Sequence, residues 1–281
     1  MVTGAVSVYF RGSMFRKRSP PAPAAKARPP RLQPGYRAYA IGDIHGRADL
    51  LAELLSVIKT DALVRPGPGT NVVVYLGDYV DRGPQSRDVI DLILSNPLPD
   101  FAEIRLLGNH DDTLLRFLDD PAIGPSWSTY GGDATLLSYG VRARPDLLGL
   151  ERYEDMRRQL HRLMPASHVE FLKNLSLSCV AGDYLFVHAG VWPGVPVDKQ
   201  SPADLLWIRD DFIDSPHDYG PVVVHGHTPF EQPDVRHNRI GIDTNAFASG
   251  MLTCLILEGE QRHFLFTGGA QANANAPDAA A

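Results

Sequence analysis

The sequence contains little cysteine and no long hydrophobic segment. Of its 281 residues only two are cysteines, Cys179 and Cys254, and each lies within an apolar run. A disulfide framework or a cysteine-rich metal site is therefore excluded, and we expect both thiols in the core. The longest apolar segments, such as 72–76 and 252–257, are far shorter than the about 18 residues that a membrane span needs. We therefore expect no transmembrane helix.

The first 34 residues contain no acidic side chain and too few large apolar side chains to form a core. They contain seven basic residues, six prolines and five alanines. Because such a composition buries too little apolar surface to fold, we expect a disordered basic tail over 1–34, within which Met14 offers an alternative start. The basic cluster follows the apolar beginning, which is not the order of a secretory signal, so a cytoplasmic location is expected. A second tail, rich in alanine and asparagine, is expected over 270–281.

Acidic residues dominate the rest of the chain. The formal net charge is −6, and the basic tail leaves the remainder at −13. This balance argues against nucleic acid as a partner and fits carboxylates clustered around cations. With 44% hydrophobic and 21% charged residues, the chain has the composition of a globular protein. We expect one domain over 35–269.

Strand and helix patterns alternate in the first half of the chain. The expected strands are 37–41, 71–76 and 103–107, and the expected helices are 48–59, 86–94 and 111–118. Helical patterns interrupted by prolines predict a helical insertion at about 119–174. Further strands are expected at 175–181, 184–188, 222–225, 239–242, 252–258 and 263–266. The order predicts an α/β fold.

Side chains that bind metals follow five of the expected strands. Aspartate, asparagine or histidine stands at each of these ends, giving the candidate ligands Asp43, His45, Asp78, Asn109, His188 and His227. Ligands of open α/β sheets bind beyond the carboxyl ends of the strands, so we expect these residues to converge. Oxygen and imidazole donors without cysteine favour Mn, Fe, Zn or Co over Ca or Cu. Six candidates exceed the needs of one catalytic ion, which predicts two ions bridged by Asp78.

Five motifs around these residues resemble a known family. They are G-D-I-H-G at 42–46, G-D-Y-V-D-R-G at 77–83, G-N-H-D at 108–111, V-H-A-G at 187–190 and G-H-T-P at 226–229. In this order they resemble the calcineurin-like metallophosphoesterase superfamily, in particular its bacterial phosphoprotein phosphatase branch. The resemblance implies a β-sandwich flanked by helices. It also implies two ions, one held by Asp43, His45 and Asp78 and the other by Asp78, Asn109, His188 and His227, with no ligand role for His225.

The resemblance also implies a mechanism. A hydroxide that bridges the two ions would attack phosphorus, and His110 would protonate the leaving oxygen as a general acid. Asp81 would hold the His110 ring, whereas Asp111 is interpreted as a helix cap. Arg82 and Arg209 are the candidates for binding the phosphoryl oxygens, because a guanidinium group donates two parallel hydrogen bonds.

The leading functional hypothesis is a serine/threonine protein phosphatase that acts on a phosphoprotein or another phosphorylated substrate. One alternative is a symmetrical dinucleoside tetraphosphate hydrolase, whose branch is expected to lack the aspartate found here as Asp81. G-N-H-D departs from the G-N-H-E of eukaryotic phosphoprotein phosphatases and keeps that alternative open. The other alternative is a metal-stabilised binding module without turnover. Manganese is the first choice of metal, and the oligomeric state is left open.

Overall fold

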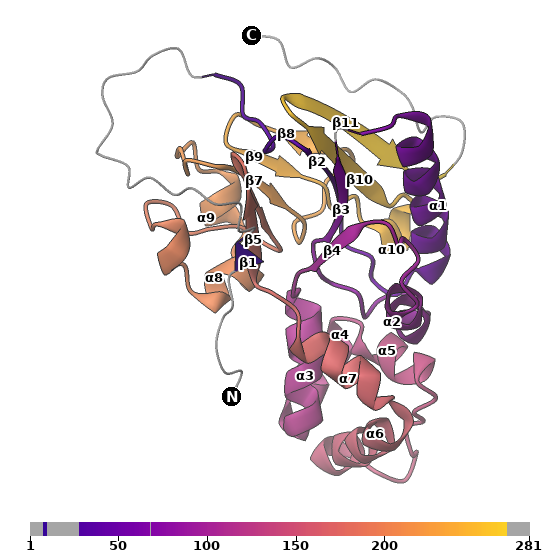
Figure 1. Cartoon of the computed structure of the whole chain (residues 1–281). Coiled ribbons are helices and arrows are strands. Elements are labelled where there is room, and N and C mark those ends of the chain that lie inside the picture. The colour runs from indigo at the N-terminus through magenta and orange to yellow at the C-terminus, as the bar shows by residue number, and fades with distance from the viewer. Residues whose placement is uncertain (1–7, 10–27, 68, 269–281) are drawn as a thin grey trace.

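Two β-sheets lie face to face in the computed structural model, which describes residues 8–9, 28–67 and 69–268 (Figure 1). One sheet has the order β1 (Val8–Tyr9), β5 (Ser178–Ala181), β6 (Tyr184–Val187), β7 (Val222–His225), β9 (Arg239–Gly241) and β8 (Asp234–Val235). The other has the order β11 (Gln261–Phe266), β10 (Thr253–Glu258), β2 (Tyr36–Ile41), β3 (Thr70–Tyr75) and β4 (Ala102–Arg105). β2, β3 and β4 are parallel, as are β6, β7 and β9. The predicted ligands follow five of these six strands.

The strands of the sandwich are buried on both faces. In β2, Ala38 and Ala40 face the opposite sheet, whereas Tyr39 and Ile41 pack on the helices outside. This two-sided burial accounts for strands that are apolar at both odd and even positions. The expected α/β sandwich flanked by helices is confirmed.

Helices cover both outer faces of the sandwich (Figure 1). The five-stranded sheet packs on α1 (Ala48–Val64), α2 (Ser86–Leu94) and α10 (Ala246–Ser249). The six-stranded sheet packs on α8 (Pro202–Trp207) and α9 (Asp210–Ile213), which follow the short helical turn Val197–Lys199. These helices leave the carboxyl ends of the parallel strands to the connecting loops, where the candidate ligands lie.

The helical region between β4 and β5 forms a separate group below the sheets in Figure 1. It comprises α3 (Asn109–Asp119), the turn Pro121–Ile123, α4 (Gly124–Thr129), α5 (Gly132–Ser138), α6 (Gly149–Leu163) and α7 (Ala166–Lys173). α3 begins at Asn109, two residues earlier than the predicted helix 111–118. Asn109 and His110 therefore stand in its first turn, which aims their side chains from a rigid element.

Residues 28–34, which the composition assigned to the basic tail, pack on the domain. Leu32 is 1% exposed among residues of both sheets, and its N–H donates to the carbonyl of Gly259 at 2.8 Å. Arg28 forms an ion pair with Asp183. Farther upstream, β1 pairs in parallel with β5. The tail predicted over 1–34 is therefore too long, because one well-placed leucine attaches its end to the core. Residues 1–7 and 10–27 of that tail, and the tail expected at 270–281, lie outside the described residues.

Replacing Leu32 with alanine is expected to lower the free energy of unfolding by about 2 to 5 kcal/mol, because the change leaves a cavity between the sheets. Urea unfolding followed by circular dichroism measures the loss. The matched change of Leu63, which is 73% exposed at the end of α1, should cost less than about 0.5 kcal/mol. Equal stabilities of the two variants would contradict the packing role of residue 32.

The structure also bears on the two cysteines and on membrane-spanning helices. Cys179 and Cys254 are both buried and unpaired, as predicted. Within the described residues, no helix combines the length and the hydropathy needed to cross a membrane.

Candidate metal centre

The six candidate ligands converge at the carboxyl ends of the strands. Asp43 and His45 follow β2, Asp78 follows β3, and Asn109 begins α3 after β4. His188 follows β6 and His227 follows β7. Each of the six is at most 5% exposed, although all are polar. Buried polar groups need hydrogen-bond or metal partners, and the contacts among these side chains indicate which kind of partner they have.

Close backbone approach brings the ligand loops together. A Cβ atom at Gly108 would lie 2.1 Å from Oδ1 of Asp78, so only glycine fits between this aspartate and the start of α3. A Cβ atom at Gly226 would lie 1.9 Å from Oδ1 of Asp43. The glycines that precede Asn109 and His227 thus let both ligands approach carboxylates of other loops.

Backbone conformation is unusual at the site. In the described ranges, seven residues other than glycine have φ in the left-handed region, and five of them are candidate site residues: His45, Asp78, Asp81, Arg82 and His227. Each such residue costs about 1 kcal/mol or more relative to a relaxed backbone. Strain concentrated in this way is typical of functional sites, where surrounding contacts hold the residues in place.

The histidine rings aim unprotonated nitrogens at other acceptors. Nδ1 of His188 donates to the carbonyl of Leu76 at 3.0 Å, so its Nε2 is an acceptor in the neutral ring. That Nε2 lies 2.8 Å from Oδ1 of Asn109 and 3.5 Å from Oδ1 of Asp78. His45 repeats the arrangement, with Nδ1 on the carbonyl of residue 80 and Nε2 3.4 Å from Oδ2 of Asp78. Acceptors facing one another require a cation to offset their repulsion.

Buried atoms without partners point to the same requirement. Oδ1 of Asp43 and Nε2 of both His45 and His227 are buried without a hydrogen-bond partner. Oδ2 of Asp43 accepts the N–H of His227 at 2.9 Å, which links the two ligand sets. The residues present therefore fit divalent cations, whose binding would satisfy all three atoms.

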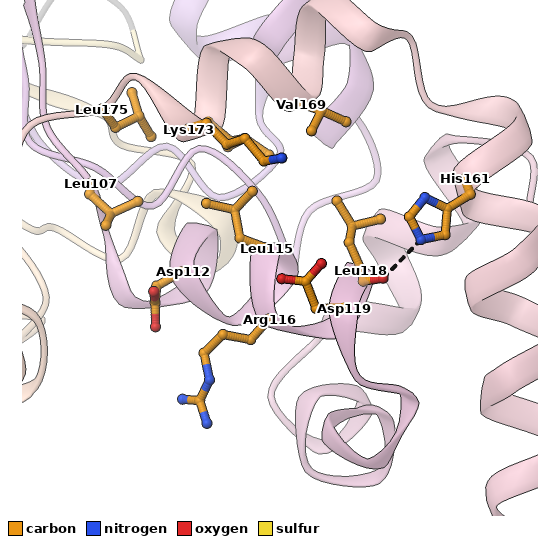
Figure 2. A pocket seen from close by; sticks show the side chains of 11 residues that line it. Leu107, Asp112, Leu115, Arg116, Leu118, Asp119, His161, Val169, Lys173 and Leu175 are labelled. Carbon is orange, nitrogen blue, oxygen red and sulfur yellow. Dashed lines mark hydrogen bonds between the residues drawn. The ribbon is translucent and has the colours of Figure 1, made fainter. Parts of the chain in front are cut away.

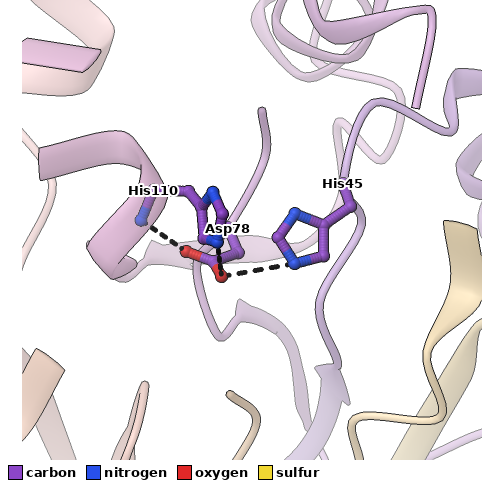
Figure 3. A group of neighbouring side chains, drawn as sticks. All are labelled: His45, Asp78 and His110. Carbon is purple, nitrogen blue, oxygen red and sulfur yellow. Dashed lines mark hydrogen bonds and ion pairs between the residues drawn. The ribbon is translucent and has the colours of Figure 1, made fainter. Parts of the chain in front are cut away.

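Two groups of side chains are close enough to hold an ion. Figure 3 shows the first, in which His45 and His110 face the carboxylate of Asp78 from two sides. The second consists of Asp78, His188 and His227. Asp78 belongs to both, as expected of a bridging ligand. The first group contains His110 where the sequence placed Asp43, but the Nδ1 atom of His110 already bonds Asp81, which favours a different role for that ring.

Burial and charge set the protonation of the ligands. Burial lowers the pKa of His45 to about 3 and also lowers that of His227, so both rings are neutral and able to ligate a metal. Burial raises the pKa of Asp43 well above its usual value, with the charges of Asp243 and Asp78 adding to the effect. Burial acts in the same direction on Asp78, but the surrounding histidines outweigh it and its pKa is lowered. The excess of buried carboxylate is the electrostatic complement of a cation.

His110 and Asp81 form the expected pair. Nδ1 of His110 lies 2.7 Å from Oδ2 of Asp81, and Nε2 lies 4.0 Å from Oδ2 of Asp78. Burial would lower the pKa of His110, but the carboxylates of Asp78 and Asp81 raise it overall. Nη2 of Arg82 is 3.2 Å from Nε2 of His110, and its guanidinium lies over the ring of Phe247 at 5.1 Å. One general-acid candidate and one phosphate-binding candidate thus stand side by side.

Arg209 lies on the side of His227. Its Nη1 donates to the carbonyl of His227 at 3.1 Å, and none of the ion pairs among the described residues links it to Asp210 or Asp211. The ring of Trp207 lies edge-on to His227, with centroids 6.4 Å apart. His225, by contrast, packs on Phe212, and its Nδ1 bonds the neighbouring Gly226 carbonyl.

Asp111 ties two ligand loops together. Its carboxylate accepts N–H groups from Gly108, Asp78 and Tyr79 at 2.8 to 3.0 Å. This is the capping role predicted for it, extended to the loop after β3.

Sequence reasoning missed several residues at the site. Trp127 and Thr135 bond Asp81, Asp243 is buried near Asp43, and Phe247 packs beside His45. The motifs contain no signal for the two residues of the helical region. Asp243 stands after β9 as the candidate ligands stand after their strands, and this position could have identified it as a residue near the site.

A separate pocket of about 550 Å³ lies among α3, α6 and α7 (Figure 2). Leucines and a valine line it together with charged residues such as Asp119 and Lys173. None of the six candidate ligands lines it. The pocket is therefore distinct from the candidate metal centre, although both lie beside α3.

A two-sheet sandwich with clustered histidines and carboxylates at its strand ends is the arrangement of a metallophosphoesterase. Residues 36–252 match the calcineurin-like phosphoesterase family. The chain belongs to this family and is a hydrolase that acts on phosphoester bonds.

Relatives carry two kinds of name. The chain is 28% identical over 228 residues to bis(5'-nucleosyl)-tetraphosphatase PrpE (asymmetrical) of Anoxybacillus flavithermus, covering 76% of this chain and 88% of the relative. It is 27% identical over 229 residues to serine/threonine-protein phosphatase 2 of Escherichia coli, covering 76% and 90%. A crystal structure described as a "putative diadenosine tetraphosphatase" matches 86% of this chain and all of its own, with a TM-score of 0.56 at 19% identity. This last likeness supports the fold.

Proposed function

We propose that the chain is a serine/threonine protein phosphatase, a phosphomonoesterase that releases an alkoxide from phosphorus. The observation that carries the proposal is the buried pair of His110 and Asp81, with 2.7 Å between Nδ1 and Oδ2. A poor leaving group such as a serine alkoxide needs a proton as it departs, whereas a phosphate leaving an anhydride is already stable. The relative from Escherichia coli, named a serine/threonine-protein phosphatase, supports this substrate class.

Two divalent ions fit the ligand set. Asp78 faces both histidine groups and would hold both ions, the first together with Asp43 and His45 and the second together with Asn109, His188 and His227. Manganese is the first choice, with iron, zinc or cobalt as alternatives. When bound, the ions supply an activated solvent nucleophile and charge neutralisation at the phosphoryl oxygens.

The residues beside the ligands have two roles, proton transfer to the leaving group and binding of the phosphoryl oxygens. Asp81 accepts a hydrogen bond from Nδ1 of His110 and with Asp78 raises the pKa of the ring, so the imidazolium form carries on Nε2 the proton that goes to the leaving oxygen. Nε2 now contacts Arg82, so the guanidinium has to turn toward the phosphoryl oxygens for the proton transfer. Arg209 is anchored through one nitrogen on the His227 carbonyl, and its other donors are available to the same oxygens.

A dinucleoside tetraphosphate hydrolase is the second candidate. Relatives such as that of Anoxybacillus flavithermus are named for asymmetrical cleavage, whereas symmetrical cleavage is the alternative expected from the sequence. The non-catalytic binding module is set aside, because the chain belongs to a family of hydrolases. We propose the cytoplasm as the location on the sequence argument alone.

Parallel assays of the manganese-loaded full chain on phosphoserine or phosphothreonine peptides and on diadenosine tetraphosphate test the proposal. We expect kcat/KM to be at least about tenfold higher on the peptides. Replacing Asp81 with asparagine should slow peptide hydrolysis about 10²-fold or more and leave the anhydride within a few-fold, because only the alkoxide needs the positioned acid. Preference for the tetraphosphate, with equal losses in the variant, would contradict the proposal. The nucleotide products would then separate symmetrical from asymmetrical cleavage.

A further inference from the structure

Both oxygens of the Asp81 carboxylate are held by residues of the helical region. Asp81 is fully buried. Its Oδ2 accepts from Nε1 of Trp127 at 2.7 Å as well as from His110, and its Oδ1 accepts from Oγ1 of Thr135 at 2.7 Å. Trp127 belongs to α4 and Thr135 to α5. The carboxylate therefore has three donors, two of which come from helices far along the chain.

Thr135 also fixes the backbone of the same aspartate. The N–H of Asp81 donates to Oγ1 of Thr135 at 2.8 Å and to Oγ of Ser86 at 3.1 Å, and the two hydroxyls are 2.9 Å apart. Asp81 has φ of +72°, a strained value for this residue type. One threonine thus binds Asp81 through its main chain and its side chain, which stabilises the strained conformation.

Trp127 links this carboxylate to the helix that carries His110. Its ring is 1% exposed and packs on Phe117 of α3 with centroids 4.7 Å apart. His110 stands in the first turn of the same helix. Any shift of α4 relative to α3 would therefore change the geometry between Asp81 and the His110 ring.

We propose that α4 and α5, which follow α3 in the helical region, are part of the catalytic apparatus, with Trp127 and Thr135 as positioning residues. They hold the Asp81 carboxylate against Nδ1 of His110, so that Nε2 of that ring points toward the metal centre. The inference rests on the proposed function, since it assigns a role within that same site. It gives the inserted helices a task in proton delivery to the leaving group.

Substrates with different leaving groups distinguish a residue that positions His110 from one that only stabilises the fold. A residue that only supports the fold would affect hydrolysis of all substrates equally, or none. A residue that positions His110 matters most where the leaving oxygen needs the proton, as in an alkyl phosphate. With 4-nitrophenyl phosphate the leaving phenolate is stable without it.

The test compares Trp127→Phe and Thr135→Val in the manganese-loaded full chain. Thr135→Val keeps the shape of the side chain and removes the hydroxyl, whereas Trp127→Phe keeps an aromatic ring on Phe117 and removes the indole N–H. On an alkyl phosphate we expect kcat to fall about tenfold or more with KM unchanged, and on 4-nitrophenyl phosphate to stay within about threefold. Thr135→Ser keeps the hydroxyl and should restore the alkyl rate. Trp192→Phe, at a residue 43% exposed, should match the wild type on both substrates. Equal losses on the two substrates, or no loss, would overturn the inference.

A second measurement keeps the inference separate from the proposed function. If the wild-type chain hydrolyses neither ester, the proposed function fails, and the positioning role is read from the Nδ1 proton of His110 by NMR of the zinc-loaded chain. A hydrogen bond of 2.7 Å to a carboxylate places this proton far downfield. We expect the resonance in the wild type and in Thr135→Ser, and its shift or loss in Trp127→Phe and Thr135→Val. An unchanged resonance in all four proteins would overturn the inference.

Discussion

Replacing Asp78 with asparagine is expected to abolish metal-dependent hydrolysis, with a loss of about 10³-fold or more. The carboxylate lies 3.4 Å from Nε2 of His45 and 3.5 Å from Nε2 of His188, so it serves both ligand groups. An amide has nearly the same shape but no charge to balance two dications. Because Lewis-acid catalysis is worth several kcal/mol and about 1.4 kcal/mol corresponds to tenfold in rate, loss of the bridge should exceed most single-residue effects. Turnover of 4-nitrophenyl phosphate measures the effect.

Metal analysis of the same variant separates loss of the ions from loss of the fold. We expect fewer than two manganese ions per chain in the Asp78 variant and an unaltered circular dichroism spectrum. Asp198→Asn, at an exposed position, should retain wild-type turnover and metal content. Substantial activity in the Asp78 variant would refute the assignment of a shared ligand.

The position of the site could be predicted because strand ends are visible in the sequence. Runs such as 72–76 are apolar at every position, and the polar residues that follow them mark where the strand ends. Since β2, β3 and β4 are parallel neighbours, the residues after them meet at one edge of the sheet. The start of α3 was harder to predict, because Gly108, Asn109 and His110 lack apolar periodicity. The helix begins there because the Asp111 side chain accepts the Gly108 N–H and the Asp78 carboxylate accepts the His110 N–H.

The support of the catalytic pair could not be predicted from the sequence. An indole ring in a helix usually serves the core, and the ring of Trp127 does so against Phe117. Its single N–H donor acquires a role only when α4 lies beside Asp81, 46 residues earlier in the chain. The packing of Leu32 could not be predicted for the same reason. Its contribution to stability depends on a space between the two sheets, which no local sequence pattern describes.

Replacing His110 with asparagine is expected to slow alkyl phosphate hydrolysis by about 10² to 10⁴ and aryl phosphate hydrolysis only a few-fold. The ring of His110 lies between two carboxylates. Its Nδ1 bonds Asp81, and its Nε2 faces the edge of the metal centre, 4.0 Å from Oδ2 of Asp78. Asparagine supplies no proton, so the barrier rises only where the leaving oxygen cannot bear the charge. A plot of log kcat against the pKa of the leaving alcohol measures this directly, and its slope should become steeper in the variant. His237→Asn, at an exposed position, should leave the slope unchanged. A parallel downward displacement of the whole plot would instead remove His110 from proton donation and assign it to stabilising the transition state whatever the leaving group.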